Sequence, residues 1–421
     1  AAPAGGGNPN QIREFKSQLG RIFSVCFSPK GNLGFSGSSL DGKGEIICFE
    51  IDTGKELWRK KVSDSAIYSL ASSPDGKTLA SGGYDGYIRL HKVSSGEVFK
   101  KFASVPIIKK STHENTFSLI GENSEDADYK TETMVKESSV HNLVLLPRKV
   151  SILRSIDYTQ LLLQGDLGGG RNADVTRIAK WTVTGGVGTV SKRGIFLPAQ
   201  DGNGTIVASL GGKEISVPVV VSGFGRKWTP DFIEDVNPII SKLGCNAGTC
   251  HGAKDGKNGF KLSLRGYDAV YDVRGFTDDM ACRRVNVAAP ESSLMLLKAS
   301  GMVPHEGGQL TDSQSKYYQV IREWIEGGAC LDENGVRGRE VGTSPKGTVA
   351  EKIGSSQQMR VVATMENGMV RDVTREAFIT SGNGEVAEHD DFGLLTTLRR
   401  GEAPILARYE GCYAATTLTV M

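Results

Sequence analysis

The sequence predicts a multidomain, mainly β protein with propeller-like sheets, two β-sandwiches and one all-α domain. Three observations support this: a repeat near the N-terminus, a pair of similar strand-rich segments, and one stretch between them with helical periodicity. The 421 residues exceed the usual size of one domain. The chain contains 53 glycines and only 7% aromatic residues, which favours strands and turns over long helices.

Residues 20–103 repeat one strand-rich unit. The Ser-Pro-x-Gly turn that begins at Ser28 recurs at Ser73, and strand patterns with a Thr/Ser-Gly turn follow each copy. A repeat of about 40–45 residues with four strands is typical of a propeller blade, and the segment resembles WD-repeat blades. Closed propellers need at least four blades. Either the remaining blades lie outside this chain, or the two blades pack on something else.

Two segments beyond the blades resemble each other. Both carry Asp-Val-Thr-Arg, at 174–177 and 372–375, and both end in alternating strands joined by a tight turn. Short strands at this spacing predict a β-sandwich over 147–224 and a second one over 340–421. They resemble bacterial Ig-like domains of group 2, which implies a spacer or adhesive role.

The remaining parts of the chain are a tail, a linker and a helical domain. We expect residues 1–19 to be an N-terminal tail and the polar, acidic residues 104–146 to be a linker. Residues 229–332 have helical periodicity instead. One helix is expected just before Cys245, with Asp231 at its start, and another is expected from Thr311 to a stop at Gly327-Gly328.

The sequence "CNAGTCH" places Cys245, Cys250 and His251 together. A c-type haem is attached by two cysteines and an adjacent histidine, normally with two residues between the cysteines, whereas four separate them here. Gly248 would allow a bulged loop that keeps both sulfurs in place. A disulfide, a zinc site completed by Cys282 or Cys330, and unrelated surface thiols are the alternatives.

The wider sequence favours haem. Residues 238–329, with "GCNAGTCHG", "GKNGFKLSLRGYD", "RRVNVAAPESSLMLLKASGMVPHEGG" and "YYQVIREWIEGGA", closely resemble the c-type cytochrome domain of large secreted proteins of planctomycetes and related bacteria. Ig-like domains and WD blades occur in the same architectures. The resemblance implies thioether bonds from Cys245 and Cys250, His251 as proximal ligand to the haem iron, and His305 as distal ligand, with Met302 as the fallback. Arg283 and Arg284 would neutralise the haem propionates, or act only as surface charges.

We therefore expect an exported monohaem c-type cytochrome that transfers one electron at a time to an unidentified redox protein. The start "AAPAGGG" fits a mature chain after signal-peptide removal, and haem c attachment implies a periplasmic, cell-surface or extracellular location. Further subunits would complete the propeller or a cell-envelope complex. The alternative is a structural or adhesion scaffold of Ig-like and WD modules, whose Cys-Cys-His cluster binds zinc or forms a disulfide.

Composition and motifs limit the other functional classes. The formal net charge of +2 gives no case for a nucleic-acid partner. The sequence contains no apolar run of 18 residues, so no transmembrane helix is predicted. No Ser-His-Asp set or phosphate loop stands out either, so an electron carrier is expected rather than a catalyst.

Overall fold

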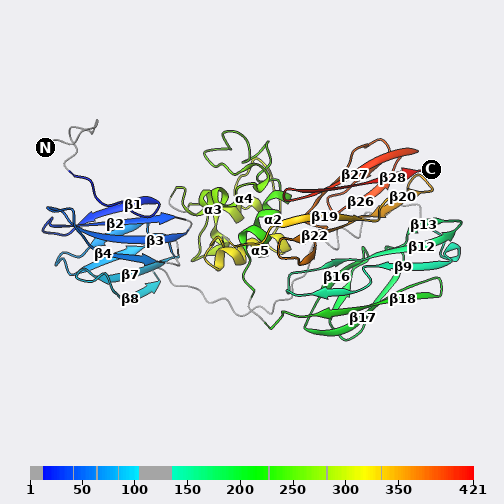
Figure 1. The fold of residues 1–421 in the computed structure, drawn as a ribbon, viewed down its shortest axis with the longest axis horizontal. Helices are drawn as coiled ribbons and strands as arrows, with labels where there is room; N and C mark the ends of the chain where they lie inside the picture. Colours follow the sequence, from blue (N-terminus) through cyan, green and yellow to red (C-terminus); the bar gives the residue numbers. More distant parts are fainter. Residues whose placement is uncertain are drawn as a thin grey trace.

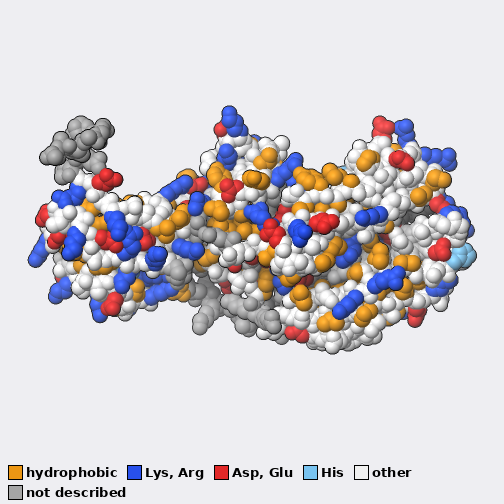
Figure 2. Space-filling model, in the orientation of Figure 1, with side chains coloured by type: hydrophobic (Ala, Val, Ile, Leu, Met, Phe, Trp, Pro, Cys, Tyr) orange, Lys and Arg blue, Asp and Glu red, His pale blue; other side chains and the backbone are white. Residues whose placement is uncertain are grey.

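The computed structural model describes residues 13–40, 42–62, 65–83, 85–103, 135–225, 228–280, 283–332 and 334–421. The described chain is elongated, with two propeller-like blades at one end, a helical domain in the middle and two sandwiches at the other end (Figure 1). Acidic and basic side chains are intermixed over the visible face (Figure 2). The prediction of a mainly β protein is confirmed. No described helix is long and apolar enough to cross a membrane.

The two blades are four-stranded antiparallel sheets that share one register. The first contains β1 (Arg21–Phe27), β2 (Leu33–Leu40), β3 (Lys43–Glu50) and β4 (Glu56–Val62), and the second contains β5 (Ser69–Ser72), β6 (Thr78–Gly82), β7 (Tyr87–Lys92) and β8 (Val98–Ala103). Ser24 pairs with Gly37 in the first sheet as Ser69 pairs with Gly82 in the second. The facing sides form one apolar core, made mainly by Phe35, Ile46, Cys48, Ile67, Leu70 and Leu79. The two blades therefore pack on each other.

Residues 13–19, which belong to the expected N-terminal tail 1–19, lie along the first blade. The ring of Phe15 contacts the ring of Phe49 at 5.0 Å between centroids. The side-chain amide of Gln18 donates to the carbonyls of Ser36 (3.2 Å) and Glu45 (2.8 Å). These contacts fix the segment because they satisfy polar groups at the sheet surface. Residues 1–12 lie outside the described residues.

The two sandwiches repeat one topology strand for strand. The first contains β9 (Asn142–Leu146), β10 (Val150–Ile152), β11 (Thr159–Gln160), β12 (Leu162–Gly168), β13 (Arg171–Asp174), β14 (Lys180–Val183), β15 (Gly188–Val190), β16 (Ile195–Pro198), β17 (Gly202–Leu210) and β18 (Lys213–Val221). The second contains β19 (Gly338–Ser344), β20 (Thr348–Ala350), β21 (Ser356–Gln358), β22 (Arg360–Met365), β23 (Val370–Asp372), β24 (Phe378–Ser381), β25 (Ala387–His389), β26 (Leu394–Thr397), β27 (Gly401–Tyr409) and β28 (Cys412–Val420). The sheet order β10-β18-β17-β14 recurs as β20-β28-β27-β24.

The first sandwich begins earlier than its sequence suggested. Strand β9 falls inside the expected linker 104–146, because Leu143 and Leu145 alternate into the sandwich core and pair with β12. The residue between them, Val144, is apolar and exposed, so the strand shows no alternation of polar and apolar residues in its sequence. The remainder of that expected linker, 104–134, lies outside the described residues.

The two sandwiches hold each other through equivalent residues. The backbone N–H of Gln160 donates to the Asp372 carboxylate at 3.0 Å, and the N–H of Gln358 donates to Asp174 at 2.6 Å. Each aspartate belongs to the Asp-Val-Thr-Arg motif of its own sandwich. Equivalent residues that contact each other reciprocally define a two-fold, self-complementary arrangement. The motif therefore joins the sandwiches as well as ordering each one.

The helical domain lies between the sandwiches in sequence. It contains a π-helical turn, Phe232–Val236, followed by α2 (Asn237–Lys242), α3 (Ala269–Thr277), α4 (Leu294–Ala299) and α5 (Lys316–Glu326). Much of the remaining chain in this domain is turn and loop, so the expectation of an all-α domain is not met. Asp231 caps the first turn by accepting from the N–H of Glu234 at 2.8 Å.

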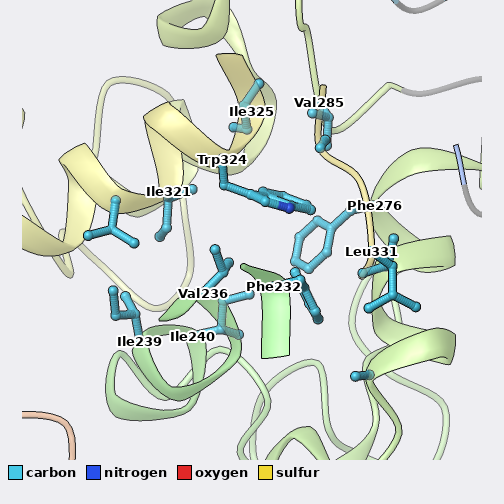
Figure 3. Packing of buried hydrophobic residues seen from close by; sticks show 14 of the residues in the cluster. Phe232, Val236, Ile239, Ile240, Phe276, Val285, Ile321, Trp324, Ile325 and Leu331 are labelled. Atoms are coloured by element: carbon cyan, nitrogen blue, oxygen red, sulfur yellow. The ribbon is translucent and has the colours of Figure 1, made fainter. Parts of the chain in front are cut away.

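Helix α5 begins later than expected from Thr311. Asp312 accepts from the N–H groups of Gln314 and Ser315, which holds a turn there, and Ser315 then caps the helix. Around it, Trp324, Phe232, Phe276 and Ile240 form the centre of the domain core (Figure 3). Both ends of the domain are thereby tied to one apolar cluster.

Asp235 connects the helical domain to both sandwiches. Its carboxylate, 1% exposed, lies 3.1 Å from the guanidinium of Arg154 in the first sandwich and 3.0 Å from that of Arg371 in the second. A second buried contact lies nearby, where Lys316 of α5 is 3.7 Å from Glu376. Burial makes such pairs costly to break, because a partner left alone keeps its charge away from water.

We expect Asp235→Asn to lower the free energy of unfolding by about 3 kcal/mol, because it leaves two partly buried arginines with less compensation. Urea unfolding followed by circular dichroism measures the effect. The matched control is Glu385→Gln, which removes an exposed ion pair with Arg399 (2.8 Å) and is expected to cost less than about 1 kcal/mol. Equal effects of the two substitutions would contradict the role given to Asp235.

Candidate ligand pocket of the helical domain

A cavity of about 470 Å³ opens beside the Cys-Cys-His segment. Its volume is in the range of small-molecule and cofactor sites. The wall is largely apolar and contains Leu243, Phe260, Phe276, Leu294, Met295 and Ile321. The cavity brings together all four predicted site residues, which are Cys245, Cys250, His251 and His305.

The loop that carries the cysteines is held by its own backbone. The N–H of His251 donates to the carbonyl of Cys245 at 3.0 Å, and the N–H of Gly252 donates to that of Ala247 at 3.1 Å. A Cβ at Gly252 would lie 2.1 Å from the carbonyl oxygen of Asn246, so only glycine fits. The glycine with positive φ in this loop is Gly244 (φ 79°), and not Gly248 as the sequence suggested.

His251 is fixed at one of its two ring nitrogens. Nδ1 lies 3.1 Å from the carbonyl oxygen of Phe260, which assigns the ring proton to Nδ1 and leaves Nε2 as an acceptor. Burial lowers the pKa of His251, because the charged imidazolium loses solvation. A neutral imidazole with one nitrogen free is suited to bind a metal.

His305 also lines the cavity, on a loop that is held by hydrogen bonds. Its Nδ1 lies 3.0 Å from the carbonyl oxygen of Gly308, and Lys298 of α4 donates to the carbonyl of Pro304 at 2.5 Å. Met302, the fallback ligand, is 74% exposed and is not part of the cavity wall. The loop therefore presents the imidazole, and not the thioether, to the cavity.

The two arginines predicted to meet anionic groups have different environments. The guanidinium of Arg284 is buried, stacks over Phe260 at 4.2 Å and donates to the carbonyls of Gly275 (2.7 Å) and Gly259 (3.2 Å). Burial lowers its pKa. Arg283 lies exposed at the cavity wall. Arg284 thus has a structural role. Of the two arginines, Arg283 is the one placed to contact an anionic ligand.

The thiol chemistry separates the alternatives for the cluster. Cys245 and Cys250 are free thiols, so they form no disulfide in this structure. Burial raises the pKa of Cys245 to about 12, so this thiol is protonated when no group is bound to it. No group of three metal-binding side chains occurs among the described residues. Cys282, a suggested fourth ligand, lies outside the described residues.

The sequence reasoning missed several residues that shape the pocket. Phe260 supplies both the carbonyl that orients His251 and an aromatic wall, with its ring centroid 4.6 Å from that of His251. Lys298 restrains the His305 loop through Pro304. An apolar residue shortly after a cysteine-histidine motif was the available signal for Phe260. Nothing local in the sequence pointed to Lys298.

Asp272 supports the segment that follows His251. The carboxylate accepts from the backbone N–H of Ser263 at 2.5 Å and from its hydroxyl at 2.7 Å, and the preceding Leu262 donates to the carbonyl of His251 at 2.8 Å. Burial raises the pKa of Asp272 to about 6. Below about pH 6 the neutral acid is therefore the favoured form in the folded state.

We expect Asp272 to make stability depend on pH. Its contribution is complete below the unfolded pKa of 3.8 and is lost as pH rises through about 6, because the folded state then carries a buried charge. Asp272→Asn should remove this part of the slope when urea midpoints are compared from pH 4 to pH 7. The control Asp255→Asn, at an exposed residue, should keep the wild-type slope. A slope unchanged in Asp272→Asn would rule out this assignment.

Comparison with known proteins identifies the blades. Residues 55–92 match the sequence model of the WD domain, G-beta repeat, so the blade region is a WD40-repeat module within a mainly β protein. The chain is 31% identical over 83 residues to the F-box/WD-40 repeat-containing protein At3g52030 of Arabidopsis thaliana, covering 20% of this chain and 18% of that protein. It is 44% identical over 54 residues to eukaryotic translation initiation factor 3 subunit I of Xenopus tropicalis, covering 13% and 17%.

Solved structures give matches of the same kind. The crystal structure of RRP9 WD40 repeats aligns at 23% identity and a TM-score of 0.19, covering 22% of this chain and 28% of that one. The structure of U3-55K aligns at 24% identity and a TM-score of 0.21, covering 23% and 31%. The chain thus spans less than a third of each of these relatives and structures.

These matches correct the predicted function. The expectation of an exported monohaem cytochrome that carries electrons is contradicted, because the matched family and relatives are WD40-repeat proteins. They show neither a cytochrome c motif nor an Ig-like domain. The family match covers residues 55–92 only, so the cofactor predicted for the pocket stays a prediction.

Proposed function

We propose that the protein is a protein-interaction scaffold, in which the WD40-repeat module is the docking part. The WD40 match of residues 55–92 carries this proposal. The helical domain fixes the module in place: Ser39 donates to Asp278 at 3.0 Å, and Arg21 lies 2.5 Å from Asp279. Docking surfaces of this kind work best when the part that presents them is rigid.

The sandwiches fit a supporting role in such a scaffold. They resemble Ig-like spacers, and their reciprocal contacts through Asp174 and Asp372 join the two sandwiches side by side into one unit. The ion pairs of Asp235 attach this unit to the helical domain. Partners captured at the blades would therefore be held at a defined distance from whatever the sandwiches contact.

Affinity capture with crosslinking from source cells tests the scaffold. The full chain is compared with Gly37→Arg, which is expected to disrupt the blade module because a Cβ at Gly37 would lie 2.6 Å from Ile67. We expect proteins other than this chain to be recovered with wild type and at least tenfold less with the variant. The same proteins at the same yield from both chains would overturn the proposal.

A second proposal concerns the pocket of the helical domain. We infer that it binds haem c, because two thiols, a neutral imidazole with a free nitrogen and a second imidazole face one largely apolar cavity. Cys245 and Cys250 would hold the group covalently, His251 and His305 would ligate the iron, and Arg283 at the wall would meet a propionate. Haem supplies a redox-active or ligand-binding iron when bound. The proposal concerns attachment alone and assigns no electron-transfer role.

Attachment would place the protein outside the cytoplasm. Thioether bonds to haem form on the outer face of the cytoplasmic membrane, so the same proposal implies a periplasmic or cell-surface location. A scaffold in that compartment would gather envelope proteins.

Intact mass and absorbance of the full chain, expressed with a haem-attachment system, test the pocket. We expect one covalent haem in wild type, none in the Cys245→Ala, Cys250→Ala double variant, and a high-spin ferric spectrum in His305→Ala. Met302→Ala is the matched control and should remain low-spin. A wild-type mass without haem, or haem that acid-acetone removes, would contradict the proposal.

A further inference from the structure

The two blades can be compared residue by residue because one offset relates them. Ser24 pairs with Gly37, and Ser69 pairs with Gly82, so a shift of 45 residues superposes the first two strands of each blade. Each blade has a forward face, which includes the glycine, and a back face. In this chain the forward face of the first blade packs on the back face of the second.

The filled contact depends on one glycine and two apolar side chains. A Cβ added at Gly37 would lie 2.6 Å from Cγ2 of Ile67 and 3.3 Å from Cδ1 of Leu70. The second blade therefore approaches the first so closely that no side chain fits at residue 37. Ile67 is fully buried and Leu70 is 8% exposed as a result.

The second blade has an equivalent forward face, and no described residue packs at its glycine. Gly82 is the counterpart of Gly37, and a Cβ added there would have no described atom within 4 Å. Beside it on the same face lie Ile88, which pairs with Gly82, and Phe102, which pairs with Ile88 and is 39% exposed. An apolar sheet face with an unfilled glycine position is an incomplete contact, since apolar surface is stabilised by burial.

The first blade carries the matching back-face residues. The counterparts of Ile67 and Leu70 are Ile22 and Val25 on β1, and they are 55% and 59% exposed. Residues 13–19 lie over β2 and β3 on this blade and leave both side chains exposed. With Phe27 on the same strand, 59% exposed, they form a group of exposed apolar side chains, and contiguous apolar surface is typical of an interaction site.

We propose that this chain associates head to tail with a second copy of itself, with Ile22 and Val25 of one copy seated at Gly82 of the next. The contact repeats between copies the one that Ile67 and Leu70 make at Gly37 within each copy. It rests on the proposed scaffold function and adds a second copy of this chain to the partners that the scaffold gathers. Because the two surfaces differ, the association is heterologous and continues into a ring or a filament.

Two variants remove one surface each. Val25→Arg places a charge on the back face, and Gly82→Arg places a large side chain on the forward face, where no described atom lies within 4 Å of an added Cβ. Sedimentation velocity of the full wild-type chain over the micromolar range should show a mass that grows beyond a dimer. Each variant alone should stay monomeric, with an unchanged thermal midpoint and circular dichroism spectrum.

Mixing the variants provides the decisive measurement. The intact forward face of Val25→Arg can accept the intact back face of Gly82→Arg, so an equimolar mixture should form 1:1 dimers that grow no further. Val370→Arg, at a residue that is 69% exposed in the second sandwich, should associate as wild type does. This control separates the proposed contact from a general effect of added charge.

Three results would overturn the proposal. A wild-type chain that is monomeric throughout would exclude self-association, and variants that associate as wild type does would place the contact elsewhere. A mixture that stays monomeric would exclude the head-to-tail arrangement. Each result leaves the capture of other proteins unaffected, so this inference and the scaffold proposal fail separately.

Discussion

The carboxylate of Asp235 is the contact on which the arrangement of the C-terminal two thirds of the molecule depends. It lies between Arg154 and Arg371, which belong to different sandwiches, and it accepts the backbone N–H of Asp231 at the start of the helical domain. One buried acid thus satisfies groups from three folded units. Because the carboxylate is buried, its interactions with the two arginines are stronger than they would be in water. Moving either arginine away would therefore cost free energy.

The sequence allowed the repeating parts to be predicted, because repeats are recorded in local signals. The turns at Ser28 and Ser73 located the blades, and the Asp-Val-Thr-Arg motifs located the sandwiches. The partners of those motifs were not predictable. The N–H of Gln358 that donates to Asp174 is far away in sequence, and a backbone group is not specified by the type of its residue. The start of α5 was also missed, because the turn at Asp312 competes with the helix over a few residues.

The candidate site was partly predictable in the same sense. Cys245, Cys250, His251 and His305 do line one cavity. Spacing alone could not say what that cavity is for, and the cytochrome assignment drawn from it is contradicted by the WD40 matches at the other end of the chain. Nor could spacing distinguish Met302 from His305, because their difference lies in which side of one loop faces inward. Arg284 looked like a partner for an anion, but its guanidinium is occupied by backbone carbonyls.

The reciprocal contact between Asp174, Gln358, Asp372 and Gln160 also restrains the helical domain when that domain unfolds while both sandwiches stay folded. The polypeptide leaves the first sandwich after Val221 and enters the second at Gly338, so the paired sandwiches close the intervening segment into a loop. A closed loop has fewer conformations than a free one, and this lowers the entropy gained on its unfolding. The contacts between the two sandwiches therefore stabilise the helical domain, although it takes no part in them. Their effect is like that of a covalent crosslink between its two ends.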